Sequence, residues 1–239
     1  MTKAKKFTLP FVRKEQLGEN TYSFYFDRRR SDWDFIPGQY VYMTLPHEDP
    51  DERGTSRYFT IASSPRQKDT LMFTMKIFQS SFKEALLQLQ PGEAVQMFGP
   101  MGWFLLPEHT AKEKVFISGG IGITPFHSLL QTVAEEKLSQ PMTLFASFAN
   151  KEELLFHDAL QKVSQNNSKI RVIYTLTQEK WSGETGRVTP SLLQKHLADI
   201  LRPVYYIVGK PAMVASTREM LLDSGVPEEH IQIEDFTGY

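Results

Sequence analysis

Residues 119–125, Gly-Gly-Ile-Gly-Ile-Thr-Pro, combine types that could bind a phosphate group. Glycine lets a ligand approach the backbone, and the free N–H groups at a helix N-terminus attract an anion. Proline suits the first turn of such a helix. The segment predicts a site for a nucleotide pyrophosphate, although a tight strand-to-helix turn in any α/β protein would look similar. The candidate binding residues are Gly119, Gly120, Gly122, Ile123, Thr124 and Pro125.

Two further segments carry polar or glycine residues next to apolar runs. Gly209 follows the apolar residues 204–208 and precedes a helix that would contain Met213. Arg57-Tyr58-Phe59-Thr60 sets a guanidinium beside two aromatic rings and a hydroxyl, a combination that could hold a phosphate and stack a flat ring. Taken alone, each segment also fits an ordinary helix start or an edge strand.

The elements around these segments change in character near residue 112. Before it, short β-branched and aromatic runs separated by Pro and Gly predict strands at residues 7–9, 21–26, 40–45, 58–62, 71–77 and 94–98. Ser80 and Ser81 can cap a helix over residues 82–89. This pattern predicts a small antiparallel barrel or sandwich.

After residue 112, apolar strands alternate with helices. Strands are predicted at residues 114–118, 142–148, 170–176, 204–208 and 231–236, and helices at about 124–137, 152–164 and 212–224. Such alternation predicts a parallel sheet covered on both faces, with ligands bound at the carboxyl ends of its strands. We therefore expect an all-β domain over residues 1–110 and an α/β domain over residues 111–239.

Bulk composition narrows the function classes. The chain has 239 residues, 41% of them hydrophobic, and a formal net charge of −1, which does not favour binding to nucleic acid or to an anionic membrane. It has no cysteine, which excludes disulfides and cysteine-ligated metal sites, and its six histidines have no metal-like spacing. No apolar stretch approaches the ~20 residues that cross a bilayer. We expect a cytoplasmic protein without a bound metal.

In order and context, these segments resemble the ferredoxin–NADP reductase superfamily. The family has R-x-[YF]-[ST] on a flavin-binding barrel, G-G-x-G-x-x-P at the start of its nucleotide domain, and a late glycine turn. Residues 35–40, Phe-Ile-Pro-Gly-Gln-Tyr, and residues 99–104, Gly-Pro-Met-Gly-Trp-Phe, also resemble the family. The resemblance covers nearly the whole chain and implies an antiparallel Greek-key FAD-binding barrel followed by an NAD(P)-binding α/β domain.

On the barrel, the resemblance implies a role for each residue of the flavin motif. Arg57 would bind the flavin phosphate, Tyr58 and Phe59 would flank the ribityl chain and the ring, and Thr60 would hydrogen-bond the ring nitrogen N5, which accepts the hydride. Backbone contacts would come from Met75, Lys76 and Ile77, and pyrophosphate contacts from Ser80, Ser81 and Phe82. The family often has Tyr in place of Phe59, so one hydrogen bond to the ribityl chain is expected to be absent. FMN in place of FAD remains open.

In the α/β domain, the resemblance implies that Thr124 lies where nicotinamide meets flavin, and that Gly209 and Met213 line the nicotinamide pocket. An aromatic side chain near the C-terminus would cover the flavin; Phe236 is our candidate and Tyr239 the alternative. Glu234 or Asp235 would supply a supporting charge. Where Val208 stands, many relatives have a cysteine near the reacting carbon, and its loss is expected to slow hydride transfer.

The segment from Ser147 to Glu153 would meet the adenosine ribose. Lys151 could pair with the 2′-phosphate of NADPH, but Glu152 and Glu153 would oppose it, which favours NADH. Arg187 is a second candidate for that phosphate.

The predicted function is a flavoprotein reductase that passes electrons to a separate acceptor, such as ferredoxin, flavodoxin or a partner oxygenase. The alternatives are an electron-transfer subunit that needs a partner for turnover, and a free-flavin or ferric reductase.

Overall fold

A computed structural model describes residues 3–102, 104 and 112–236. The chain forms two compact units. Unit 1 comprises Met1–Leu105 and His127–Glu135, and unit 2 comprises Leu106–Phe126 and Glu136–Tyr239. The predicted boundary at residues 110 and 111 lies outside the described residues.

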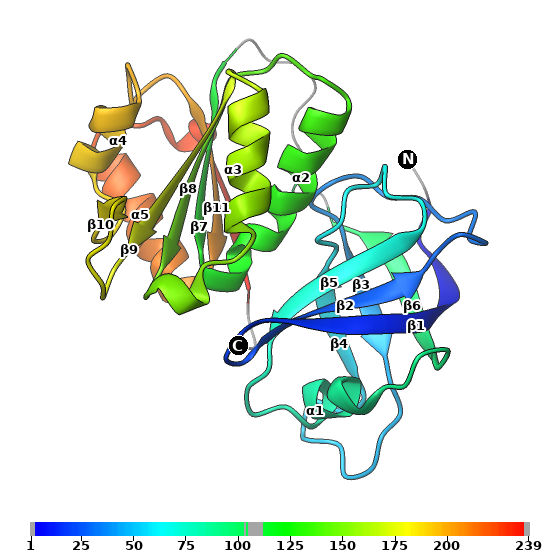
Figure 1. The fold of residues 1–239 in the computed structure, drawn as a ribbon. Coiled ribbons are helices and arrows are strands. Elements are labelled where there is room, and N and C mark those ends of the chain that lie inside the picture. Colours follow the sequence, from blue (N-terminus) through cyan, green and yellow to red (C-terminus); the bar gives the residue numbers. More distant parts are fainter. Residues whose placement is uncertain (1–2, 103, 105–111, 237–239) are drawn as a thin grey trace. The chain divides into compact units, whose positions relative to one another are not determined.

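Unit 1 is built on a six-stranded antiparallel sheet with the strand order β4-β3-β6-β1-β2-β5 (Figure 1). Its end strands β4 and β5 lie next to each other, so the sheet curves into a barrel. The strands are β1 (Lys5–Gly18), β2 (Thr21–Asp27), β3 (Tyr40–Thr44), β4 (Ser56–Thr60), β5 (Thr70–Lys76) and β6 (Ala94–Met101). The predicted antiparallel barrel is confirmed.

β1 is much longer than the strand expected at residues 7–9. Its first half, Lys5–Pro10, pairs with β6, and its second half, from Phe11 to Gly18, pairs with β2 with register shifts after Phe11 and after Gln16. The second half is rich in charged residues, so it lacks the alternating hydrophobic pattern by which a strand is predicted from sequence. Phe24, Phe26 and Phe73 are fully buried inside the barrel. Burying side chains of this size contributes about 2 kcal/mol each.

One helix, α1 (Ser81–Gln88), belongs to the barrel sequence, as predicted. Ser80 caps it, because its hydroxyl accepts a hydrogen bond from the backbone N–H of Lys83 at 3.4 Å. Phe82 and Leu86 bury the inner face of the helix. The first turn of α1 is therefore fixed both by its cap and by packing.

Residues His127–Glu135 of α2 (Thr124–Glu135) belong to unit 1 and bond to the segment that follows β4. The Nδ1 of His127 donates to the carbonyl oxygen of Ala62 at 2.7 Å, and the Ser128 hydroxyl donates to that of Ser63 at 2.6 Å. Burial lowers the pKa of His127 to about 4, so the imidazole is neutral at pH 7. These bonds hold the chain immediately after the flavin motif.

Unit 2 is built on a six-stranded parallel sheet with the order β10-β9-β8-β7-β11-β12 (Figure 1). Its strands are β7 (Lys114–Gly119), β8 (Met142–Phe148), β9 (Ile170–Leu176), β10 (Glu184–Thr185), β11 (Val204–Gly209) and β12 (Ile231–Asp235). Helices α4 (Pro190–His196) and α5 (Pro211–Asp223) pack in one apolar core with the sheet. On the opposite face, the ring of Phe116 contacts that of Phe126. The predicted parallel α/β fold is confirmed.

Two helical segments of unit 2 differ from expectation. The helix predicted over residues 152–164 is instead a 3₁₀ turn, η2 (Lys151–Glu153), followed by α3 (His157–Asn166). Phe156 separates the two, because its φ of 57° lies in the left-handed region. Helix α4 was not expected, although its N-cap Thr189 and the following Pro190 are a typical helix start. The other two 3₁₀ turns of unit 2 are η1 (Gly120–Ile123) and η3 (Glu228–His230). Among the described residues, no helix is long and apolar enough to span a membrane.

Candidate functional site

Strand β4 directs the flavin motif to two faces of the barrel sheet. Arg57 and Phe59 pair with Met43 and Val41 of β3, which are fully buried, so both side chains lie on the inner face. Tyr58 and Thr60 alternate with them and lie on the outer face. The four residues of the motif therefore do not form one surface.

The two aromatic rings of the motif have different surroundings. Phe59 is 3% exposed and stacks on Phe82, with 5.7 Å between ring centroids. Tyr58 is 63% exposed, and its ring contacts those of Tyr42 and Tyr40 at 4.7 and 5.6 Å. Phe59 is thus a core residue of the barrel, and Tyr58 is the ring of the motif that a ligand can reach.

Arg57 is held by the loop that precedes β4. Its Nη1 donates to the carbonyl oxygens of Arg53, Gly54 and Ser56, each at 2.8 Å, and its Nη2 to Oδ1 of Asp51 at 2.5 Å. Among the described residues, its Nε is buried without a hydrogen-bond partner. A buried guanidinium with an unsatisfied donor suits an anionic ligand.

Arg57 lies beside the start of α1, which also carries predicted site residues. Its guanidinium carbon is 5.5 Å from the centroid of the Phe82 ring. The Ser81 hydroxyl accepts the backbone N–H of Asp51 at 2.9 Å and lies 2.9 Å from Nε2 of His47. The fold therefore brings together the two predicted phosphate-binding elements, Arg57 and the first turn of α1, and so fits the pyrophosphate of a flavin dinucleotide.

The end of β5, where backbone contacts to the flavin were predicted, lies close to the same helix. Met75 is buried, and the carbonyl oxygen of Lys76 accepts a hydrogen bond from Nζ of Lys83 at 2.9 Å. The backbone N–H of Ile77 donates to Asn20 at 2.7 Å. Lys83 connects this strand end to the first turn of α1.

Three residues near this site were not expected from the sequence: Asp51, Arg53 and Lys83. The spacing Asp51-x-Arg53 is typical of a turn in which the aspartate accepts a backbone N–H two residues on, and the structure has this bond at 2.9 Å. Their place beside Arg57 depends on tertiary contacts, for which the sequence has no local pattern.

In unit 2, the glycine turn after β7 packs against the end of β11. A Cβ on Gly122 would lie 2.4 Å from the carbonyl oxygen of Val208. A Cβ on Gly119 or Gly209 would lie 3.4 or 3.0 Å from Sδ of Met213. The structure thus brings both predicted glycine turns and Met213 to one edge of the sheet, as expected for strands that end side by side.

The other candidates in unit 2 lie at the same edge. Gly120 has a φ of +54°, with open space where a side chain would be, so its backbone can be approached. Ser147 pairs with Gly119 across β8 and β7, and the backbone N–H of Phe236 donates to Gly209 at 3.0 Å. The Thr124 hydroxyl donates to the carbonyl of Ile121 at 3.0 Å and the residue is buried. Tyr239 lies outside the described residues.

The structure distinguishes the two acidic residues near the C-terminus. Asp235 is exposed, whereas Glu234 is half-buried in register with Val208 of β11, and its Oε2 is buried without a partner among the described residues. Burial raises the pKa of Glu234 to about 7. Glu234 is therefore the carboxyl of this pair that can change its protonation near neutral pH.

In the segment expected to meet the adenosine ribose, residues 147–153, Lys151 is already paired with a carboxylate. Nζ of Lys151 lies 3.6 Å from Oε1 of Glu179, whose Oε2 accepts the backbone N–H of Lys151 at 2.9 Å. Glu153 donates its backbone N–H to Oδ1 of Asn150 at 3.1 Å. The charge environment of this loop does not favour an additional phosphate.

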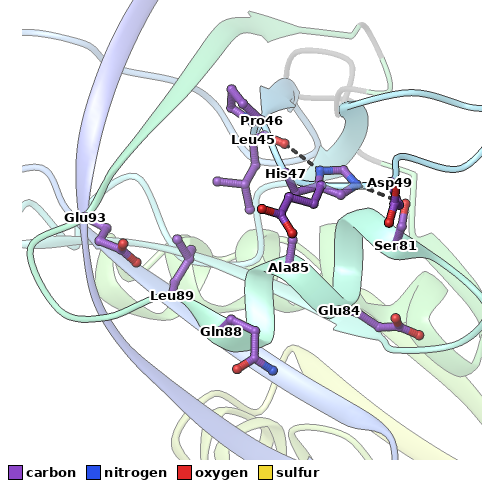
Figure 2. Close-up of a pocket in the computed structure, with 11 residues that line it drawn as sticks. Leu45, Pro46, His47, Asp49, Ser81, Glu84, Ala85, Gln88, Leu89 and Glu93 are labelled. Carbon is purple, nitrogen blue, oxygen red and sulfur yellow. Dashed lines mark hydrogen bonds between the residues drawn. The ribbon is translucent and has the colours of Figure 1, made fainter.

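Unit 1 also has a pocket of about 620 Å³ along α1 (Figure 2). His47 and Ser81 lie on its wall, joined by the hydrogen bond described above. Its other polar lining residues are mainly acidic: Glu48, Asp49, Glu84 and Glu93. This lining would repel a phosphate, so the pocket is not a candidate for the phosphate end of a flavin.

Comparison with known proteins assigns each of the two sheets to a domain family. Residues 8–105 match the family model of the oxidoreductase FAD-binding domain, and residues 116–219 that of the oxidoreductase NAD-binding domain. Together the two matches cover most of the chain. The protein belongs to the oxidoreductases that combine an FAD-binding domain with an NAD-binding domain.

Two curated relatives are each a component of a larger enzyme. One is a component of the Na(+)-translocating NADH-quinone reductase of Klebsiella pneumoniae, 27% identical over 89% of this chain and 55% of its own length. The other is the reductase component of propane 2-monooxygenase from Mycolicibacterium smegmatis, 27% identical over 86% of this chain and 60% of its own length. The chain thus spans a little over half of the relatives it matches.

Solved structures share the fold. A ferredoxin NADP+ reductase from Neisseria gonorrhoeae, with bound FAD and NADP, matches 98% of this chain and 99% of its own with a TM-score of 0.81 at 24% identity. The cytochrome P450 reductase GcoB of Amycolatopsis matches 98% of this chain and 71% of its own with a TM-score of 0.85 at 19% identity.

Proposed function

We propose that this protein is a flavoprotein reductase that transfers hydride from NADH to bound FAD and passes electrons to a separate protein acceptor. The observation that carries the proposal is the convergence of Arg57 on the first turn of α1, where a buried guanidinium donor has no partner among the described residues. A pyrophosphate is the ligand group that this combination suits best.

When bound, the flavin would accept two electrons as hydride and release them singly; the protein binds it and positions the donor. Arg57 and the start of α1 would hold the phosphates, and Tyr58 would contact the ring system from the outer face of β4. Thr60 lies on that same face and would donate its hydroxyl hydrogen bond to the ring nitrogen that takes the hydride. Met75, Lys76 and Ile77 would contribute backbone contacts from the end of β5.

For the nicotinamide nucleotide, the glycine turn from Gly119 to Pro125 would bind the pyrophosphate at its open backbone. Gly209, Met213 and Thr124 would border the nicotinamide, and Phe236 would cover the flavin until the nucleotide enters. We propose NADH over NADPH, because Lys151 is paired with Glu179 and two further carboxylates adjoin it.

The electrons are proposed to pass to an acceptor outside these 239 residues, because the 239 residues include no cysteine to hold an iron–sulfur cluster. The two relatives support this, since each is named as one part of a larger enzyme. The class of acceptor, whether ferredoxin, flavodoxin or oxygenase, is the part that an assay must decide.

The test is to purify the protein and record its visible spectrum, then add NADH without oxygen. A yellow chromophore that NADH bleaches, faster than NADPH does, is expected, followed by reoxidation on addition of a ferredoxin or flavodoxin. A colourless preparation that also fails to bind added FAD would contradict the proposal. Loss of the flavin during gel filtration, with turnover of free flavin, would instead indicate a free-flavin reductase.

A further inference from the structure

Three cationic side chains of unit 1 meet at the first turn of α1. Arg53 donates from Nη2 to the carbonyl oxygen of Gln79 at 2.8 Å, just before the helix begins. Arg57 places its guanidinium over the ring of Phe82. Lys83 belongs to the first turn itself and is 5% exposed. Three positive charges are thus collected around one helix N-terminus, whose dipole is also positive there.

One carboxylate lies between two of these cations. Oδ1 of Asp51 accepts from Nη2 of Arg57 at 2.5 Å and from the backbone N–H of Arg53 at 2.9 Å, and its Oδ2 accepts from Nη2 of Arg53 at 3.1 Å. The backbone N–H of Asp51 is bonded to Ser81. The Asp51 carboxylate therefore occupies hydrogen-bonding positions of Arg53 and Arg57 that an anionic ligand would use, and the backbone of Asp51 is tied to the first residue of α1.

The pKa values of Asp51 and Lys83 are both shifted by the neighbouring arginines. Burial acts to raise the pKa of the Asp51 carboxyl, but the hydrogen bonds from Arg53 and Arg57 outweigh it, and the pKa lies well below its usual range. Burial, with the positive charges of Arg53 and Arg57, lowers the pKa of Lys83 to about 8. The Asp51 carboxyl is therefore held in its charged form by the two arginines.

We propose that Asp51 is an internal substitute for a flavin phosphate: its carboxylate holds Arg53 and Arg57 in the flavin-free protein, and the entering pyrophosphate displaces it and also pairs with Lys83. The inference rests on the proposed flavin site and adds Asp51 as a competitor and Arg53 and Lys83 as ligands. A pyrophosphate carries two negative charges where Asp51 carries one, so it attracts Arg53 and Arg57 more strongly at the same distance.

Asp51→Asn tests the competition with little structural change. The amide oxygen can still accept the N–H of Arg53, and the backbone bond to Ser81 is untouched, so mainly the charge is lost. Asp49→Asn is the matched control, because Asp49 is an exposed carboxylate of the same loop, and its positive φ of 46° is one that Asn tolerates.

Dissociation constants of flavin-free full-length protein would be measured for FAD and for riboflavin, which lacks phosphate. Asp51→Asn is expected to bind FAD about tenfold more tightly than the unchanged protein, as expected when a charged hydrogen-bonding competitor is removed, with riboflavin unchanged. Asp49→Asn should leave both values unchanged. Lys83→Met should weaken FAD by about tenfold and leave riboflavin unchanged.

The outcomes separate the two proposals. If the unchanged protein binds FAD but Asp51→Asn binds it equally or more weakly, Asp51 positions Arg57 rather than competing, and the inference is wrong. If no variant binds FAD or riboflavin, the proposed flavin site itself is wrong. If Asp51→Asn does not fold, Asp51→Ser takes its place, because serine keeps a turn-forming oxygen without the charge. Its dissociation constants for FAD and riboflavin then decide the proposal.

Discussion

The glycine at position 122 and the carbonyl oxygen of Val208 leave no room for a side chain between them. A Cβ on Gly122 would lie 2.4 Å from that oxygen and 2.8 Å from its carbon, distances that real Cβ atoms do not show. Both partners are backbone, so neither can rotate away. The turn after β7 is therefore closely packed on the end of β11.

Gly122→Ala should destabilise unit 2, because one of the two strand ends has to move. Overpacking of this kind costs about 3 kcal/mol or more. Because the same turn is proposed to bind the nucleotide pyrophosphate, NADH affinity should fall too. Urea unfolding and NADH titration measure the two effects.

Gly120→Ala is the comparison for this prediction. A side chain at position 120 would face open space, but the φ of +54° there is unfavourable for alanine. The substitution should therefore lower the free energy of unfolding by only about 1 kcal/mol. Equal losses in the two variants would show that backbone conformation, and not the contact with Val208, sets the cost.

Glu234 should make stability depend on pH between about 4.5 and 7. Its pKa in the folded protein is raised to about 7 by burial, above an unfolded value near 4.5, so the folded state binds the proton more tightly. Below pH 4.5 the group is protonated in both states and costs nothing. As the pH rises to 7, the unfolded state ionises first and the free energy of unfolding falls, by at most about 3 kcal/mol.

Glu234→Gln should remove this dependence. Relative to the unchanged protein, the variant should become more stable between pH 5 and pH 8, as measured by urea unfolding at both values. Asp235→Asn, at an exposed neighbour, is the control. A stability difference that stays constant with pH would show that Glu234 does not titrate in this range.

The sequence predicted the residues whose local backbone demands are distinctive. Glycines at 119–122 followed by Pro125 define a strand-to-helix turn by themselves, and Ser80 defines a cap, so both were located correctly. The turn and the cap depend only on residues that are adjacent in the chain, so they can be predicted from the sequence.

The sequence could not predict features that depend on distant partners. Whether Phe59 faces a ligand or the core depends on Phe73 and Phe82, which are remote in the chain and pack against it. The choice between Glu234 and Asp235 required the register of β12 on β11. The pairing of Asp51 with Arg57 likewise needs the loop before β4 in its folded form.

The ion pair between Lys151 and Glu179 should influence the choice of nucleotide. Glu179→Gln keeps an oxygen for the backbone N–H of Lys151 but removes the counter-charge of its ammonium, which then becomes available to a 2′-phosphate. We expect kcat/KM for NADPH to rise about threefold, a modest effect because the pair is exposed, with NADH unchanged. Steady-state kinetics with both nucleotides measure this ratio.

Glu219→Gln is its control, since Glu219 is an exposed carboxylate of α5 and the change in net charge is the same. A similar rise in both variants would indicate a general charge effect. No rise in either would mean that Lys151 does not meet the 2′-phosphate.

Thr60 should affect the rate of flavin reduction more than the binding of flavin. It lies on the outer face of β4 with Tyr58, away from Arg57, so its hydroxyl can serve the ring while the phosphates are held elsewhere. Thr60→Val keeps the shape and removes the hydrogen-bond donor, and the loss of one donor to a developing charge slows a reaction by about 100-fold in well-ordered sites. Thr60→Ser retains the donor, and its rate of flavin reduction should stay close to that of the unchanged protein.

Anaerobic stopped-flow mixing with NADH measures the rate of flavin reduction, and bound flavin per chain measures occupancy. If Thr60→Val and Thr60→Ser are reduced at equal rates at full flavin occupancy, the Thr60 hydroxyl does not contact the reacting atoms. Thr60 would then have only a structural role in β4.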